Sequence, residues 1–396
     1  MKVSAVIGAN YGDEAKGLIT DYLCSKSKSL VVRFNGGAQA GHTVVTPKGK
    51  RHVFHHFGSG TFASAPTFLS KHFVCHPMFF MNEYFDLFNG HGYVPKVFVD
   101  PASLVTTPWD IMLNQAAEES RGESRHGSCG MGMNETIHRS EDPDYYLSVY
   151  DLSSQYLADK LDLIRTEYLA QRADQLKITA AMPYVMDERV MTHYLDDVKR
   201  FLSKVEICDW KALELDGYDL VFEGAQGLLL DQDNKENFPH VTRSKTGVHN
   251  VLEMLEERPD LITEPVDAYY VSRTYLTRHG RGPLPNELFD KKPYLNVNDN
   301  TNAFNVHQES LRYAYLNIDT LKERILEDAK LPVRPKLALT CADQIYGKVM
   351  EYIDKEGEGW GTPVINFARM VSKAWGGKDC LISYGPHRND VKEIQL

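Results

Sequence analysis

Short apolar runs recur along the whole chain, separated by longer stretches in which apolar positions repeat with helical spacing. The runs are rich in β-branched residues and are often followed by Gly or Asp, which is typical of buried strands. Seven strands are predicted, at Val3–Ile7, Ser29–Phe34, Lys96–Val99, Leu220–Glu223, Ala268–Ser272, Lys336–Thr340 and Cys380–Tyr384.

The helical spacing predicts six helices, at Lys16–Ser25, Trp109–Glu119, Asp144–Gln171, Asp187–Val205, Glu309–Ala329 and Phe367–Trp375. Strands that alternate with helices favour a mostly parallel sheet. No Pro- or Ser-rich linker interrupts the pattern. We therefore expect a single α/β domain over residues 1–396. Its core would be a large, mostly parallel twisted sheet flanked by helices, similar to that of P-loop NTPases, with insertions.

Composition narrows the functional classes. The formal net charge is -10, from 44 basic and 54 acidic residues, which argues against a general nucleic-acid-binding protein. The N-terminus lacks the apolar segment of a signal peptide, and no apolar run is long enough to span a membrane, so we expect no membrane partner. The six cysteines are scattered without a C-x-x-C pair, which is consistent with a reducing cytosol and a cytoplasmic location.

The turn after the first predicted strand is the most informative segment. It reads Gly8-Ala-Asn-Tyr-Gly-Asp-Glu-Ala-Lys-Gly17, and a predicted helix follows. A glycine turn at a helix start offers free N–H groups and a favourable dipole to an anion, and Lys16 adds a point charge. The spacing is not that of a Walker loop. An ordinary strand-to-helix turn, with Asp13 as a helix cap, is the alternative interpretation.

Other polar residues follow predicted strands in the same way. Asp13, His42, Gln226 and Asp343 each lie just after one. Ligands of parallel sheets bind at the carboxyl ends of the strands, so these four side chains are candidates for one crevice. The run from His52 to His56 is interpreted as structural, because no carboxylate or cysteine partner is evident.

Several of these segments together resemble the adenylosuccinate synthetase family. Its GDEGKG, RF-x-GG-x-N-AGHT and FEGAQG segments are similar to Gly12–Gly17, Arg33–Thr43 and Phe222–Gly227. Its GTTG-x-G, YPYVT, YTTRVGEGP, LTKLD and S-x-GP-x-R segments are similar to Gly127–Gly132, Phe238–Thr242, Tyr275–Pro283, Leu339–Asp343 and Ser383–Arg388. The resemblance therefore covers almost the whole chain.

The resemblance implies a ligase that phosphorylates the 6-oxo group of a purine nucleotide and then displaces phosphate with the amine of L-aspartate. It implies Asp13 as the base for N1–H and a Mg²⁺ ligand, His42 as the group that stabilises phosphoryl transfer, and the Gly41 carbonyl as a second Mg²⁺ ligand. The nucleoside triphosphate would be bound by Gly12, Glu14, Ala15, Lys16, Gly17, Gly41, Thr43, Asp343, Ser383 and Gly385. The purine nucleoside monophosphate would be bound by Gln39, Ser128, Cys129, Arg139, Gln226 and Thr242. Arg139 resembles an arginine that crosses a dimer interface, so a homodimer is expected.

Four departures from the family motifs matter. Gln39 stands in place of Asn, Cys341 in place of the lysine of LTKLD, and Met131 in place of Lys or Arg. The loss of the lysine makes ATP or dATP credible beside GTP. The family's TTTGRPRR loop, which binds the aspartate carboxylates, corresponds to residues 300–308, which contain no arginine. Thr301 and Arg278 are the candidates for binding the amine donor, with Arg281 and Arg312 as alternatives to Arg278. If none of these arginines serves, the donor is not aspartate.

These departures leave the substrate open. The C-terminal region resembles phage enzymes that act on dGMP to give 2-aminoadenylosuccinate, whereas retention of Asp13 favours inosinate slightly. The alternatives of another class are a nucleotide kinase or NTPase without ligation, and a weakened nucleotide-binding protein.

Overall fold

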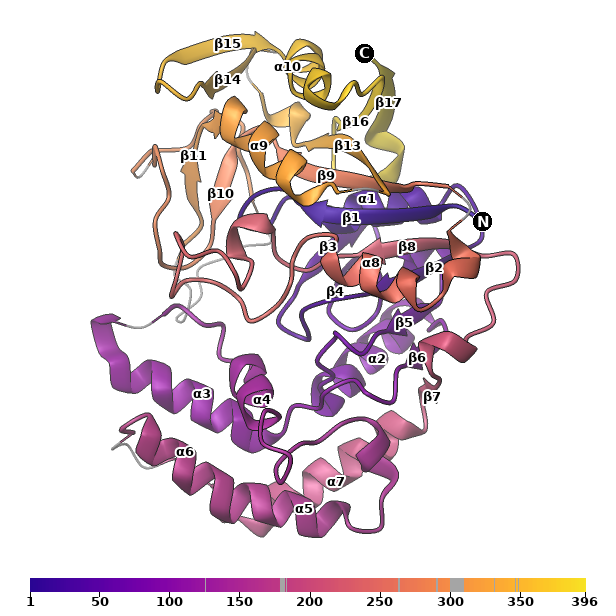
Figure 1. The fold of residues 1–396 in the computed structure, drawn as a ribbon, viewed down its shortest axis with the longest axis vertical. Coiled ribbons are helices and arrows are strands. Elements are labelled where there is room, and N and C mark those ends of the chain that lie inside the picture. The colour runs from indigo at the N-terminus through magenta and orange to yellow at the C-terminus, as the bar shows by residue number, and fades with distance from the viewer. Residues whose placement is uncertain are drawn as a thin grey trace.

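A ten-stranded sheet forms the centre of the molecule (Figure 1). The computed structural model describes residues 1–396 except 125, 179–181, 183, 263, 290, 300–309, 331, 346 and 348. The strand order is β17-β16-β13-β9-β1-β8-β2-β5-β6-β7. Every neighbouring pair is parallel except β16 and β17. The strands are β1 Val3–Gly8, β2 Ser29–Arg33, β5 Thr67–Leu69, β6 Val97–Val99, β7 Glu206–Ile207, β8 Asp219–Glu223, β9 Val266–Arg273, β13 Val333–Thr340, β16 Asp379–Ser383 and β17 Val391–Gln395.

Alternating residues of the central strands pack against helices on the two faces of the sheet. Ala5 and Ile7 of β1 belong to a core shared with α8 His249–Glu256, α9 Ile318–Asp328 and α10 Val364–Ser372. Val6 instead packs with α1 Lys16–Cys24 on the opposite face. Both faces are therefore covered, which explains why the central strands read as continuous apolar runs.

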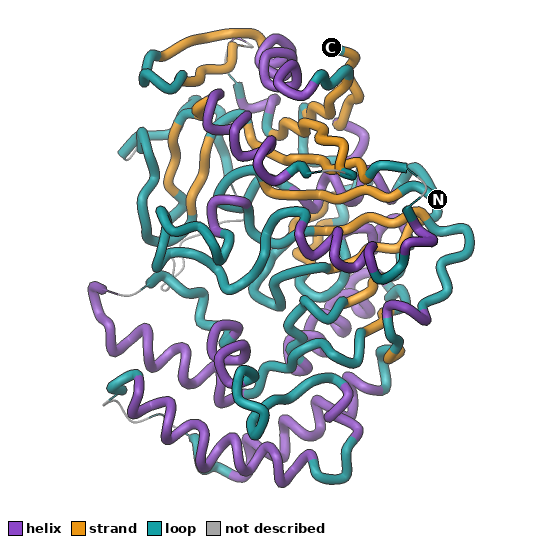
Figure 2. The backbone as a smooth tube through the Cα atoms, viewed as in Figure 1, coloured by secondary structure: helices purple, strands orange, loops and turns teal. Residues whose placement is uncertain are grey.

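A helical region extends from the β5–β6–β7 end of the sheet, and Figure 2 shows how helices dominate that end of the molecule. It contains α2 Pro77–His91, α3 Pro108–Arg121, α4 Met133–Arg139, α5 Leu157–Leu163, α6 Leu169–Gln175 and α7 Glu188–Leu202. Three small sheets complete the fold: β3 His42–Val45 with β4 Arg51–Phe54, β10 Leu276–Arg278 with β11 Arg312–Ala314, and β12 Leu316–Asn317 with β14 Val349–Ile353 and β15 Gly359–Pro363. None of the helices among the described residues is both long and apolar enough to cross a bilayer.

The predicted fold class is confirmed, and all seven predicted strands belong to the central sheet. The helix predicted at Glu309–Ala329 is wrong in its first part, because Arg312–Ala314 form β11 and Leu316–Asn317 form β12. The helix begins at Ile318, where the Asn317 side chain accepts the amides of Asp319 and Thr320 at 3.1 and 3.0 Å. The helix predicted at Asp144–Gln171 begins only at Leu157, and α2 was not predicted.

Candidate active site

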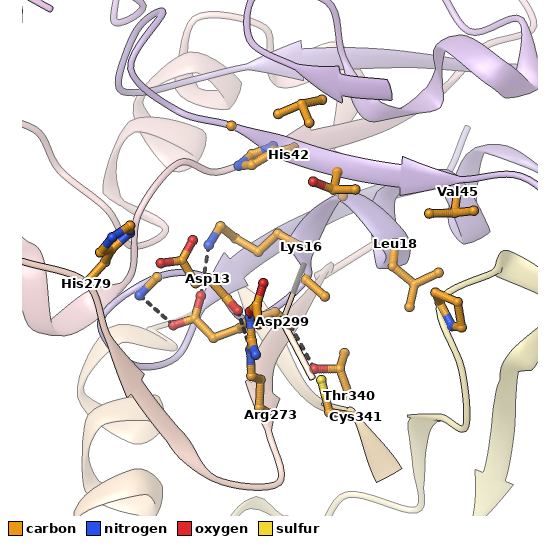
Figure 3. A pocket seen from close by; sticks show the side chains of 18 of the residues that line it. Asp13, Lys16, Leu18, His42, Val45, Arg273, His279, Asp299, Thr340 and Cys341 are labelled. Carbon is orange, nitrogen blue, oxygen red and sulfur yellow. Dashed lines mark hydrogen bonds and ion pairs between the residues drawn. The ribbon is translucent and has the colours of Figure 1, made fainter. Parts of the chain in front are cut away.

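A cavity of about 850 Å³ lies at the carboxyl ends of the central strands (Figure 3). Its walls come from the turns after β1, β2, β8, β9 and β13, as the rule for parallel sheets predicts. Most of the residues expected at a site line it: Gly12, Asp13, Glu14, Ala15, Lys16, Gly17, Gln39, Gly41, His42, Thr43, Cys129, Gln226, Asp343 and Gly385.

The turn between β1 and α1 is organised by Glu14. Its carboxylate accepts the amides of Asn10 and Gly12 at 3.1 and 2.8 Å, and it pairs with Lys16 Nζ at 2.9 Å. Lys16 and Glu14 are both buried. The Gly12 amide is therefore already engaged. Lys16 faces the cavity as one partner of an ion pair, which fixes its ammonium group without leaving its charge uncompensated.

The Asp13 carboxyl lies on this turn, and its main chain is held by Arg273. Arg273 Nε donates to the Asp13 carbonyl at 2.6 Å, and Arg273 Nη2 donates to Asp299 Oδ2 at 2.7 Å. Burial raises the pKa of the Asp13 carboxyl, and the charges of Arg273 and Lys16 only partly offset this effect. A carboxylate with a raised pKa is a better proton acceptor, which suits a general base.

His42 is oriented by a buried carboxylate on β8. Its Nδ1 lies 2.7 Å from Glu223 Oε1, and the amide of Ser59 donates to Glu223 Oε2 at 3.0 Å. Burial alone would raise the pKa of Glu223, but His42, Arg33 and Ser59 together hold it at about 2. An ionised Glu223 accepts a hydrogen bond from Nδ1–H and leaves His42 Nε2 for a ligand. Gly17 allows this approach, since a Cβ there would lie 3.1 Å from His42 Cβ.

Several residues that line the cavity have strained backbone conformations. Four non-glycine residues that line it have left-handed backbone conformations, at φ of 57° to 66°: Asp13, Ala15, Gln226 and Cys341. Such conformations cost free energy and persist where the surrounding structure imposes them, typically at functional sites. Ala15 occupies the fourth position of the GDEGKG motif, where the family has glycine.

The residues expected to bind a nucleoside monophosphate divide into two groups. Gln39, Cys129 and Gln226 line the cavity, whereas Ser128, Thr242 and Arg139 do not. The Ser128 hydroxyl donates to Asn114 Oδ1 at 3.0 Å.

Arg139 is a correction to the sequence-based expectation. Its side chain is fully buried, and its guanidinium donates to both carboxylate oxygens of Asp110 and to the carbonyls of Val105 and Tyr145. It joins α4 to the start of α3. The structure therefore does not offer Arg139 to a nucleotide in a second subunit.

Asp343 and Gly385, two residues that the sequence analysis assigned to the triphosphate, line the cavity. Burial raises the pKa of Asp343. Ser383 does not line the cavity; its hydroxyl donates to the Gly385 carbonyl at 2.5 Å and so supports the loop that does. Thr340 Oγ1 donates to the Glu14 carbonyl at 2.9 Å, which ties β13 to the first turn.

The structure describes only one of the two residues that were expected to bind the amine donor. Thr301 lies outside the described residues. Arg278 is buried against the Tyr11 ring, and its guanidinium donates to Asn237 Oδ1 and to the carbonyls of His240, Arg281 and Pro283. The expectation that Arg278 contacts the donor is therefore not supported by its geometry.

Several cavity residues were missed by the sequence analysis: Tyr11, Arg51, Arg273, His279, Asn296, Asn298 and Asp299. Arg273 directly follows the predicted strand Ala268–Ser272, so the rule that selected Asp13 could have found it. Asn296, Asn298 and Asp299 belong to a polar loop with no periodic pattern, and only the tertiary structure brings them to the cavity.

The cavity fits Mg²⁺ better than a softer metal. Asp13 and Gly41 offer a carboxylate and a carbonyl oxygen at its wall, and Mg²⁺ is usually bound by one or two carboxylates together with substrate phosphates. Among the described residues, no three His, Cys, Asp or Glu side chains converge on a possible metal position. A cation beside Asp13 would also offset the cost of burying that carboxylate.

Comparison with known proteins agrees with this geometry. A family model for adenylosuccinate synthetase matches residues 5–324. The chain belongs to the adenylosuccinate synthetase family. The adenylosuccinate synthetase of Acaryochloris marina is 31% identical over 303 residues, which cover 72% of this chain and 63% of that protein. The enzyme of Bacteroides fragilis is 29% identical over 297 residues, which cover 74% of this chain and 67% of its own length.

Two solved structures of enzymes share the fold. Fully ligated adenylosuccinate synthetase from Plasmodium falciparum superposes with a TM-score of 0.75 at 18% identity, and the match covers 99% of both chains. Cyanophage S-2L succinoaminodeoxyadenylate synthetase, bound to dGMP and dATP, superposes with a TM-score of 0.61 at 15% identity, and covers 99% of this chain and 95% of its own. The match to the Acaryochloris marina protein spans less than two thirds of that protein's length.

Proposed function

We propose that this protein is a purine nucleotide ligase that joins L-aspartate to C6 of a 6-oxopurine nucleoside monophosphate and hydrolyses a nucleoside triphosphate. The observation that carries the proposal is the convergence of Asp13, Lys16 and His42 on one cavity. A base, a phosphate-binding cation and an oriented imidazole are the groups that phosphorylation of a lactam oxygen requires.

The first step would activate the 6-oxo group. Asp13 takes the proton from N1, so that negative charge accumulates on O6 as it attacks the γ-phosphoryl group. Lys16 holds the phosphates. His42, whose Nδ1–H is held by Glu223, donates a hydrogen bond from Nε2 to the transferring group once that nitrogen is also protonated. Mg²⁺ bound by Asp13 and Gly41 would neutralise phosphate charge.

The second step would replace the phosphorylated oxygen. The amine of aspartate attacks C6, a C–N bond forms, the C6–O6 bond breaks, and inorganic phosphate leaves with O6. Asp13, which holds the N1 proton after the first step, gives it to the ring or to the departing phosphate, and the carboxylate then accepts a proton from the attacking nitrogen. The reaction needs no covalent intermediate with the enzyme. The chain contributes by positioning the reacting groups.

Inosinate is the lead substrate, because the chain retains Asp13, whereas some of the phage enzymes that act on dGMP have a small residue in place of this aspartate. The N1 proton itself does not discriminate, since hypoxanthine and guanine both carry one. A second candidate is a guanine nucleotide, GMP or dGMP, which would give the 2-amino product. The Oε1 atoms of Gln39 and Gln226 are buried without a hydrogen-bond partner at the cavity wall. Two unsatisfied acceptors favour a base edge with several N–H donors, and guanine has more of these than hypoxanthine.

The triphosphate is GTP, ATP or dATP. Cys341 lines the cavity where the family motif has lysine, so GTP would lack one contact expected to cover its base. We also expect the enzyme to act as a homodimer, although without a contribution from Arg139.

Mass spectrometry of reaction mixtures tests the proposal. The protein is incubated with Mg²⁺, aspartate, one of the three triphosphates, and IMP, GMP or dGMP. A succinylated nucleotide whose formation requires all components supports ligation, and its mass identifies the base. Triphosphate hydrolysis that is independent of aspartate, without an adduct in any mixture, would instead indicate a kinase or NTPase.

A further inference from the structure

A row of buried polar side chains runs along α3. Asp110, Asn114 and Glu118 are spaced four residues apart, so they lie on one face of the helix. Their exposed fractions are only 1%, 4% and 4%. Buried polar groups are costly unless they find hydrogen-bond partners. All three find them in the segment that follows α3, and Asp110 does so by pairing with Arg139 of the neighbouring α4 (Figure 1).

Asn114 closes the loop between these two helices, which we call the α3–α4 loop and define as residues 126–132. Asn114 Oδ1 accepts the Gly132 amide at 3.2 Å and the Ser128 hydroxyl at 3.0 Å. The Ser128 hydroxyl also accepts the Gly130 amide at 3.3 Å. One side-chain oxygen of α3 therefore ties the middle of the loop to its end.

Glu118 binds three consecutive amides of the same loop. Its carboxylate accepts the amides of Gly127 and Ser128 at 2.9 and 3.2 Å, and the amide of His126 at 3.4 Å. Burial alone would raise the pKa of Glu118, but Arg121 and two of these amides together hold it below its usual value. The carboxylate is therefore ionised, and hydrogen bonds to an ionised acceptor are the stronger kind.

The later amides of the α3–α4 loop lie at the cavity. Cys129 lines the cavity wall. Burial raises the pKa of its thiol, and the amides of Met131 and of Cys129 itself oppose this shift. Both amides therefore approach the sulfur atom. Backbone N–H groups that converge in a glycine-rich loop form a concave site for an anion, so the loop has one set of amides bound to α3 and another set beside the cavity.

The α3–α4 loop borders the part of the cavity that is expected to hold the nucleoside monophosphate. The loop leads directly into Met133, the first residue of α4. Gln39 Nε2 donates to Met133 Sδ, and Gln39 lines the cavity and is one of the residues assigned to the monophosphate. The anion that this part of the cavity would receive is the 5′-phosphate.

We propose that Glu118 is a positioning residue for the nucleoside monophosphate. It binds the first three amides of the α3–α4 loop and thereby fixes the loop so that its later amides face the 5′-phosphate. This inference rests on the proposed function. Glu118 does not line the cavity, so its effect depends on the conformation of the loop. A loop that is ordered before the ligand arrives costs less entropy on binding.

Calorimetric titration with inosinate and with inosine, which differ only in the 5′-phosphate, tests the proposal. Glu118→Gln removes the negative charge and places an NH₂ group among amide donors. We expect the Kd for inosinate to rise about 10–100-fold, the effect of losing hydrogen bonds to a charged group. The Kd for inosine should change less than about twofold. dGMP and deoxyguanosine provide the same comparison for the second candidate base.

Two further variants of α3 complete the experiment. Gln115→Ala removes an exposed side chain whose Nε2 donates to the Gly130 carbonyl at 3.3 Å. It should raise the Kd for inosinate about 2–5-fold, the effect of one neutral hydrogen bond, without changing the Kd for inosine. Glu119→Gln makes the same change of charge at an exposed neighbouring position. It is the matched control and should alter neither Kd.

An unchanged Kd for inosinate in Glu118→Gln would overturn the inference. An equal loss of inosine binding would also overturn it, because it would indicate general damage to the cavity. So would tighter binding of inosinate, which would show that the carboxylate competes with the phosphate for the loop amides. If Glu118→Gln does not fold, an unchanged Kd for inosinate in Gln115→Ala would overturn the inference instead. Wild-type protein that binds none of these nucleotides would refute the proposed function itself.

Discussion

At the scale of single residues, the account depends on how Glu223 fixes the tautomer of His42. Replacing Glu223 with Gln removes the negative charge that holds the Nδ1 proton, so we expect kcat for ligation to fall on the order of 10²–10⁴-fold. The buried Arg33 also loses a charged partner 3.9 Å away, so the free energy of unfolding should fall by about 3–5 kcal/mol. Steady-state kinetics measured well below the melting temperature of the variant separate the loss of kcat from the loss of stability. Glu253→Gln on α8, which removes a partly exposed carboxylate paired with Lys71 far from His42, is the control for the loss of one ion pair. Normal turnover in Glu223→Gln would show that His42 needs no oriented tautomer.

At the scale of elements, the β3–β4 hairpin that carries His42 is fixed to α2 by Glu83. Its carboxylate accepts the amides of His55 and His56 at 2.8 and 2.7 Å. Glu83→Ala would leave two buried amides unsatisfied, and we expect about 2–4 kcal/mol less stability together with lower activity. Thermal melts with EDTA and with added Zn²⁺ provide the check. A wild-type melting temperature that rises with Zn²⁺, in an effect that His52→Ala abolishes, would mean that His52, His55 and His56 bind metal, contrary to the structural role that the sequence predicted.

The elements also show where sequence reasoning succeeds. The β1 strand, its glycine turn and α1 were predicted within about one residue because their signals are local. Arg139 and residues 312–317 were misread because their structure depends on distant partners. Asp110, which engages Arg139, lies on another helix, and Asn317 begins a helix inside an otherwise regular helical pattern. Roles implied by the family motifs, such as those of Ser128 and Thr242, stay predictions.

At the scale of the whole molecule, the C-terminal region is tied to the first helix by a buried ion pair. Arg388 Nε lies 2.8 Å from Asp21 Oδ2, and Asp21 is fully buried. Burial raises the pKa of Asp21 to about 7, although Arg388 opposes the shift. In the folded state the Asp21 carboxyl therefore stays protonated at pH values at which it is already ionised in the unfolded state. The free energy of unfolding consequently declines as the pH rises from about 4 towards 7.

Asp21→Asn should remove that decline. Denaturant unfolding is expected to show the variant more stable than the wild type at pH 8 by about 1–3 kcal/mol, with the difference shrinking towards pH 5. The opposite trend, a variant that loses stability at pH 8, would mean that the attraction to Arg388 outweighs the cost of burying the charge.

The central claim is that Asp13 and His42 act together on one purine oxygen. It is tested most directly with inosinate labelled with ¹⁸O at the 6-position, in a reaction with triphosphate, Mg²⁺ and aspartate. The account predicts that the label appears in inorganic phosphate in proportion to the adduct formed, and that both signals are lost in Asp13→Asn and His42→Ala. Adduct formed without label in the phosphate, or labelled phosphate produced at the wild-type rate by either variant, would contradict it.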